Sequence, residues 1–133
     1  MSEEILTIFE GLYELRFPIE KARLIDYYEA NDALSMADNN TSAFNCRKVT
    51  GGKGWSQHTY GEAIDINPLQ NPYVTSRGVE PAGGKEFLNR VKRQKGMILA
   101  DDPVVKLFAK YGWKWGGSWN SVKDYQHFSK SGR

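Results

Sequence analysis

The chain has two histidines, and each lies in a short polar cluster. His58 is followed seven residues later by Asp65, and His127 is preceded by Asp124. Histidine and carboxylate are the usual ligands where a catalytic zinc ion keeps an open position for water, whereas cysteines close structural zinc sites. The chain has a single cysteine, Cys46. His58, Asp65 and His127 supply the three ligands that a catalytic Zn2+ site needs, so the residues favour hydrolysis by metal-activated water.

Asp124 lies three residues before His127, a spacing that allows two roles. As a general base, it can take a proton from the activated water and then pass it to the leaving nitrogen. As a neighbour of the ligands, it can instead accept a hydrogen bond from a ligand histidine and orient that ring. The spacing does not decide between the two roles.

Arg47 and Ser56 are candidates for contacts with a substrate. An arginine guanidinium fits a carboxylate or the oxyanion of a tetrahedral intermediate. A serine hydroxyl beside His58 can donate or accept one hydrogen bond. A surface salt bridge for Arg47 and a turn or cap hydroxyl for Ser56 are the ordinary roles of such residues, and both alternatives stay open.

The candidate ligands need rigid elements to hold them. Residues 63–67 alternate with period two, which predicts a strand with its isoleucines on one face and Asp65 on the other. Residues 43–47 alternate in the same way, so Arg47 can share the cleft of Asp65. Two segments rich in glycine and proline, Gly51 to Gly54 and Pro68 to Gly84, are predicted as long surface loops and as walls of that cleft.

Helices are predicted around this strand. The clearest begins with Pro103 in its first turn and ends at Gly112. A shorter helix is expected from Lys85 to about Val91, and Pro18 can start one that runs toward Tyr28. At the N-terminus, residues 5–12 fit a helix while residues 12–17 alternate like a strand, so that boundary stays open. Three tryptophans near the C-terminus, Trp113, Trp115 and Trp119, are assigned to packing.

Length and composition predict one small domain over residues 1–133. Hydrophobic residues make up 40% and charged residues 26%, which is ordinary for a folded globular chain. The net charge of +2 lacks the concentrated basic balance of a nucleic-acid binder. The sequence has neither an apolar run of membrane-spanning length nor a secretory signal. We expect a monomer.

Three motifs resemble a known family. They are Ser56-x-His58-x-x-Gly61-x-Ala63-Ile64-Asp65, Gly112-Trp113-x-Trp115-Gly116-Gly117-x-Trp119 and Asp124-x-x-His127-Phe128. Together they are similar to the VanY-like zinc peptidases of bacteria and phage endolysins, which comprise D-alanyl-D-alanine carboxypeptidases and L-alanyl-D-glutamate endopeptidases. The resemblance runs from about Asn39 to Phe128.

The resemblance implies a small α+β fold, shared with the hedgehog signalling domain, in which helices pack on an antiparallel sheet that carries the zinc site. It implies His58, Asp65 and His127 as ligands and decides for Asp124 as the catalytic acid and base. Ser56 and Arg47 match substrate-binding positions.

The expected activity is therefore zinc-dependent hydrolysis of peptidoglycan stem peptides, with endopeptidase action slightly favoured over carboxypeptidase action. A zinc-stabilised binding domain without catalysis is the alternative, because the same fold can serve recognition. A cell-wall substrate places the expected location outside the cytoplasm, in the periplasm or cell wall.

Overall fold

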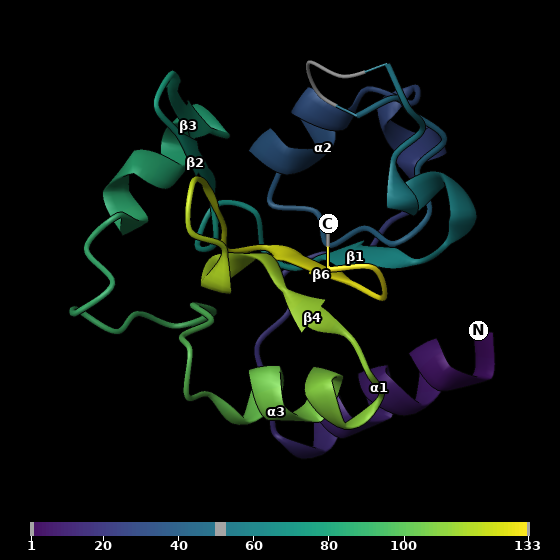
Figure 1. The fold of residues 1–133 in the computed structure, drawn as a ribbon, viewed down its shortest axis with the longest axis vertical. Coiled ribbons are helices and arrows are strands. Elements are labelled where there is room, and N and C mark those ends of the chain that lie inside the picture. Colours follow the sequence, from purple (N-terminus) through teal and green to yellow (C-terminus); the bar gives the residue numbers. More distant parts are fainter. Residues whose placement is uncertain (1, 50–52, 133) are drawn as a thin grey trace.

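A three-stranded antiparallel sheet lies at the centre of the computed structural model, which describes residues 2–49 and 53–132 (Figure 1). Its strands are β1 (Ala63–Asp65), β6 (His127–Ser129) and β4 (Lys114–Trp115), in that order. The register places His127 directly opposite Asp65. Because directly opposite residues of an antiparallel pair share a face, the sheet itself brings two predicted ligands together. The predicted α+β class is confirmed.

Two α-helices, α1 (Ser2–Glu14) and α3 (Pro103–Lys110), lie together beside this sheet and bury its apolar side (Figure 1). Phe108 of α3 stacks on Phe128 of β6 with ring centroids 3.9 Å apart. The helix predicted from Pro103 is confirmed, and the N-terminal segment proves helical as far as Glu14. The buried core consists of Ile8, Leu12, Ile64, Ile66, Ile98, Val104, Phe108, Trp113, Trp115 and Phe128.

A second antiparallel sheet has the order β3-β2-β5. Its strands are β2 (Tyr73–Thr75), β3 (Gly78–Glu80) and β5 (Lys123–Asp124). The β2–β3 hairpin lies within the segment predicted as a long loop, so that prediction is wrong. Its strands are too short to stand out among prolines and glycines, and Gly78 turns the chain with a φ of 146°, which suits glycine.

Opposite this second sheet lies α2 (Asp32–Ala37), with the 3-10 helices η1 (Ile25–Tyr28) and η2 (Gln57–Tyr60). Figure 1 shows α2 and the β2–β3 hairpin on either side of the end of the central sheet. The two flanking parts therefore frame the strand ends that carry the predicted ligands.

The helix predicted from Pro18 toward Tyr28 is wrong, because only its last residues form a helix, η1. The rest is irregular apart from an isolated bridge at Lys21, and asparagine side chains bond parts of its backbone. Asn40 accepts a hydrogen bond from Arg23 N at 2.7 Å and donates one to Arg23 O at 3.1 Å. Asn67 donates to Pro18 O at 2.7 Å. Such side-chain bonds replace the bonds that a helix would make.

The helix predicted from Lys85 to Val91 is also wrong. The chain forms a 3-10 helix, η3 (Ala82–Phe87), and then runs irregularly with Val91 96% exposed. The Arg90 guanidinium takes the place of regular backbone bonding. It donates to the carbonyl oxygens of Gln70, Phe87 and Ile98, which ties the segment to the core.

Residues 43–47 form no strand, although their alternation holds, with Asn45 buried and Phe44 exposed. The chain is anchored instead by an isolated bridge between Ser42 and Asp65.

The predicted loop at Gly51 to Gly54 lies largely outside the described residues. A last 3-10 helix, η4 (Gly116–Ser118), follows β4 and precedes β5. Within the described ranges, the helices are too short or too polar to cross a membrane.

Candidate active site

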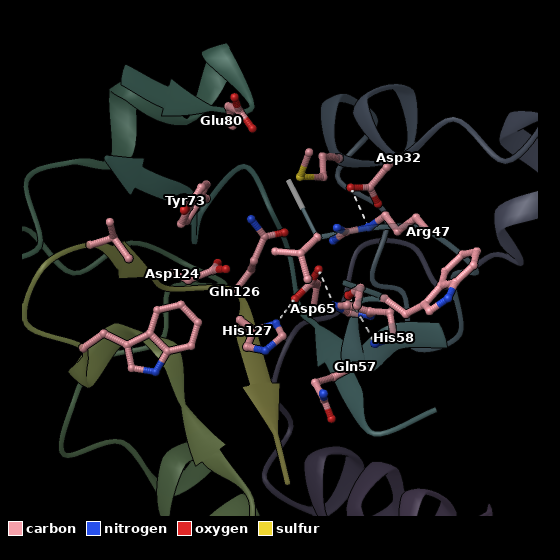
Figure 2. Close-up of a pocket in the computed structure, with 16 residues that line it drawn as sticks. Asp32, Arg47, Gln57, His58, Asp65, Tyr73, Glu80, Asp124, Gln126 and His127 are labelled. Atoms are coloured by element: carbon pink, nitrogen blue, oxygen red, sulfur yellow. Dashed lines mark hydrogen bonds and ion pairs between the residues drawn. The ribbon is translucent and has the colours of Figure 1, made fainter. Parts of the chain in front are cut away.

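The three predicted ligands lie together in the folded chain. One ligand atom from each of His58, Asp65 and His127 lies within 4.8 Å of the other two, and all three residues are buried. His58 Nε2 is 3.0 Å from Asp65 Oδ2, and His127 Nδ1 is 3.0 Å from Asp65 Oδ1. Figure 2 shows this group at the base of a cleft.

The local fold fixes the orientation of His58. η2 begins after Ser56, whose Oγ accepts a hydrogen bond from His58 N at 3.3 Å. The ring nitrogen Nδ1 of His58 lies 2.8 Å from the carbonyl oxygen of Ala43. Because that carbonyl is an acceptor, it holds a proton on Nδ1, so Nε2, which faces Asp65, is the ring atom that can bind a metal. A backbone carbonyl in this place is a common support for a metal-binding histidine.

The Asp65 carboxylate is held from both sides. Its backbone exchanges hydrogen bonds with Ser42 at 2.8 and 2.9 Å, and β1 pairs it with β6. Burial alone would raise the pKa of Asp65, but the charge of His58 and the hydrogen bonds from His127 and His58 outweigh burial and keep it below its ordinary value. Asp65 is therefore ionised over the whole neutral range.

This donor set fits a zinc ion. Catalytic zinc sites commonly use three histidines, or two histidines with a carboxylate, and ligands about 2.1 Å from a tetrahedral ion lie about 3.4 Å apart. Each histidine nitrogen lies 3.0 Å from one oxygen of the Asp65 carboxylate, which is close to that spacing, although the two histidines face different oxygens. Two neutral imidazoles and one carboxylate leave a net positive charge on a divalent ion, which suits a Lewis acid.

Asp124 reaches the same cleft from β5, next to the turn that leads into β6. Part of the residue is exposed, but Oδ1 is buried and makes no hydrogen bond within the described ranges. Burial and then the nearby charge of Asp65 raise the pKa of Asp124 to about 7. A Cβ on Gly116 would lie 2.6 Å from the Asp124 carbonyl oxygen, so only glycine allows η4 to pack against this strand.

Arg47 lines the cleft from the side of α2, where it forms an ion pair. Its Nε lies 3.1 Å from Asp32 Oδ2, and the other oxygen of Asp32 accepts a hydrogen bond from Asn45 Nδ2 at 2.7 Å. The terminal nitrogens of Arg47 point toward the middle of the cleft in Figure 2. The salt bridge left open from the sequence is therefore present, and it leaves the end of the guanidinium facing the cleft.

Ser56 also lines the cleft. Its hydroxyl caps η2 through the bond to His58 N, which is the ordinary cap role left open from the sequence. A contact between Ser56 and a substrate stays a prediction.

The cleft has a volume of about 320 Å³. It contains all six residues singled out from the sequence as site residues and several that were not. Its described lining comprises Asp32, Met36, Arg47, Val49, Trp55, Ser56, Gln57, His58, Asp65, Tyr73, Glu80, Trp119, Val122, Asp124, Gln126 and His127.

Other elements bring polar residues to the cleft that were not predicted from the sequence. Asp32 begins α2, a helix that was not predicted, while Tyr73 and Glu80 belong to the hairpin assigned to a loop. Trp119 was assigned to packing and also lines the cleft. Gln126 could have been found, because it lies between Asp124 and His127 in the polar cluster itself.

Comparison with known proteins agrees with the geometry. A family model described as D-alanyl-D-alanine carboxypeptidase matches residues 50–130, which is more than half of the chain and includes His58, Asp65, Asp124 and His127. A search of the solved structures gives no significant match. The buried histidine and carboxylate group and the matched family lead to one conclusion: the chain belongs to the D-alanyl-D-alanine carboxypeptidase family of zinc-dependent peptidases.

Proposed function

We propose that the protein is a zinc-dependent peptidase that hydrolyses the stem peptides of peptidoglycan, and that it acts as an endopeptidase between L-alanine and D-glutamate. The observation that carries the proposal is the convergence of His58, Asp65 and His127 with Asp124 in one cleft. Family membership supports a peptide substrate. The resemblance of the tryptophan-rich ending to endolysin enzymes supports the choice of bond.

His58, Asp65 and His127 would hold the zinc ion, each through the atom that faces the other two. When bound, zinc supplies a Lewis acid that polarises the scissile carbonyl and acidifies the attacking water. The hydrogen bond at Nδ1 of His58 directs Nε2 toward the metal position. Because Asp65 is already ionised, zinc would not have to displace a proton from its carboxylate.

Asp124 would move the proton. A carboxyl whose pKa is raised by burial can accept the proton of the attacking water and give it to the leaving nitrogen. Its buried position lowers the competition from bulk water for that proton. Arg47 would bind a carboxylate of the peptide through its terminal nitrogens, and Ser56 would hold His58 in place and border the substrate.

Digestion of purified muropeptides by the zinc-loaded protein, followed by mass spectrometry, tests the proposal. We expect cleavage after the L-alanine of the stem. The His58→Ala variant, which lacks one ligand, is the control and should give no product. Release of free D-alanine alone would replace the endopeptidase by a carboxypeptidase. Absence of any product from the zinc-loaded parent would contradict the peptidase proposal and favour the zinc-stabilised binding domain.

A further inference from the structure

Gln126 has a buried side chain with an amide oxygen that is unpaired within residues 2–49 and 53–132. The residue is 2% exposed and lines the cleft. Its side-chain oxygen, Oε1, is buried and makes no hydrogen bond to any part of the chain that the structure describes. Buried amide oxygens are nearly always paired in folded proteins, so one that is unpaired in a cleft is available to accept a hydrogen bond from a ligand there.

The backbone holds Gln126 in a fixed place. Its carbonyl oxygen accepts a hydrogen bond from Ile66 N at 3.0 Å, directly beyond the β1–β6 pairing. In Figure 2 its amide extends into the cleft beside Asp124, and Arg47 points into the cleft from the other side. A ligand in the cleft would therefore meet an amide oxygen on one side and a guanidinium on the other.

The Arg47 guanidinium and the Gln126 amide oxygen suit opposite kinds of hydrogen-bonding group. Arg47 offers only donors, so it suits a carboxylate or a carbonyl oxygen. Oε1 of Gln126 is an acceptor, so it suits an N–H group. A peptide backbone carries one N–H donor per residue apart from proline, and it loses water from these groups when it enters a cleft. An acceptor in the wall compensates for that loss.

We propose that Gln126 binds the substrate, with Oε1 accepting a hydrogen bond from one backbone N–H of the peptide. The inference rests on the proposed peptidase function and adds a residue that recognises the peptide backbone. It gives Gln126 a role separate from those of the metal ligands and Asp124, since it acts on the affinity for a peptide and not on the proton.

Binding of a stem pentapeptide, L-alanyl-γ-D-glutamyl-L-lysyl-D-alanyl-D-alanine, tests the proposal by calorimetry. The protein is the zinc-loaded Asp124→Asn variant, which should cleave the peptide too slowly to affect a titration. Adding Gln126→Met removes the amide and keeps a side chain of similar length. We expect affinity to fall about two- to tenfold, as for the loss of one neutral hydrogen bond. Zinc content and Tm are measured on the same samples.

Gln70 supplies a matched control, because its Oε1 is also buried without a hydrogen-bond partner among the described residues, but it lines a different cavity. Gln70→Met should leave peptide affinity unchanged. A second series replaces each backbone N–H of the pentapeptide in turn by an ester oxygen. One ester should weaken binding to the protein with Gln126 and have no further effect on Gln126→Met, the non-additivity expected of two groups in contact.

The outcomes separate this inference from the proposed function. If the parent binds the pentapeptide and Gln126→Met binds it equally well, the Gln126 inference is overturned and the peptidase proposal stands. If every ester costs the same affinity in both proteins, the inference is likewise overturned. If the parent binds no stem peptide at all, the substrate class itself is wrong, and the role given to Gln126 falls with it.

Discussion

At the scale of single residues, the site holds two carboxyls with opposite behaviour. The pKa of Asp65 lies below its ordinary value because both histidines face it, while burial and the charge of Asp65 raise that of Asp124 to about 7. Pairs of acids whose surroundings separate their pKa values in this way commonly divide the work of a site. A permanently ionised carboxylate suits a metal ligand, and one that titrates near neutrality suits proton transfer.

Replacing Asp124 with asparagine tests this division of work. We expect the rate of peptide hydrolysis to fall by about 10²- to 10⁴-fold, the usual contribution of a general acid or base. Zinc content should stay at about one ion per chain, because His58, Asp65 and His127 are untouched. Initial rates and elemental analysis of the same preparation measure both quantities. An unchanged rate would remove Asp124 from the mechanism, and loss of zinc would make it a fourth contributor to metal binding.

At the scale of elements, α2 has a direct connection to the cleft. Asn31 caps the helix by accepting a hydrogen bond from Leu34 N at 3.1 Å, which fixes Asp32 in the first turn. Burial raises the pKa of Asp32, although the charge of Arg47 opposes the shift. Asp32 in turn holds the Nε edge of Arg47, and the end of the guanidinium faces the cleft. The helix thereby positions the guanidinium.

Asp32→Asn is expected to weaken this positioning. The KM for a peptide with a free carboxylate should rise about three- to tenfold, while kcat changes less, because Asp32 itself does not touch the reacting atoms. Steady-state kinetics with the stem peptide measure the two constants separately. Asp38→Asn, at the other end of α2 and outside the cleft lining, is the matched control. A fall in kcat alone would contradict a positioning role.

Asp38 also predicts how stability depends on pH. Hydrogen bonds from Lys21 Nζ, at 2.6 Å, and from Tyr28 Oη, at 2.7 Å, hold the pKa of Asp38 below its ordinary value of 3.8. A carboxyl with a lowered folded-state pKa stabilises the fold above its unfolded pKa, and this contribution is lost as the pH falls through the folded-state value.

The difference in free energy of unfolding between the parent and Asp38→Asn should therefore be largest near neutral pH and shrink below about pH 4. Denaturant unfolding of both proteins between pH 3 and pH 7 measures it. The site lies on the surface, so the difference itself should be small. A difference that does not change with pH would show that Lys21 and Tyr28 do not stabilise the ionised form.

The elements also explain which features were predictable from sequence. The strand around Asp65 and the helix at Pro103 carry their own local signals, an alternation of isoleucines and a proline after an acidic start. The segments that were predicted wrongly are held by distant side chains. Asn40 and Asn67 bond the backbone of Arg23 and Pro18, and Arg90 donates to the carbonyl oxygens of Gln70 and Ile98, which lie outside the predicted helix. Such partners are not local in the sequence, so no pattern within the segment reveals them.

Long-range contacts also determine which residues line the cleft. The two candidate histidine ligands were recognisable because the chain has only two histidines, each in a polar cluster with an aspartate. Tyr73 reaches the site only because β2 pairs with β5 and places it opposite Asp124. Asp32 reaches it only through the fold of α2. Pairing of this kind depends on register and packing, which one sequence does not give.

At the scale of the whole molecule, the site joins parts of the chain that are far apart. The candidate ligands come from η2, β1 and β6, and the wall with Asp32 and Arg47 comes from residues before the matched range of 50–130. The two ends of the chain are tied as well. Glu4 of α1 pairs with Lys130 at 2.8 Å and accepts a hydrogen bond from Trp113 at 2.7 Å. The ligand geometry therefore exists only when the chain is folded, so metal affinity and stability should be linked.

Removal of zinc tests this linkage. A ligand that binds only the folded chain adds about 4 kcal/mol of stability when its free concentration is a thousand times Kd. For a chain of this size, that corresponds to a rise in Tm on the order of 10 °C. We expect a chelator to lower Tm by this amount and added zinc to restore it, as measured by calorimetry. The His58→Ala protein should show neither change. An equal response in that variant would place the stabilising ion elsewhere, and no response in the parent would mean that the His58, Asp65 and His127 group does not hold zinc.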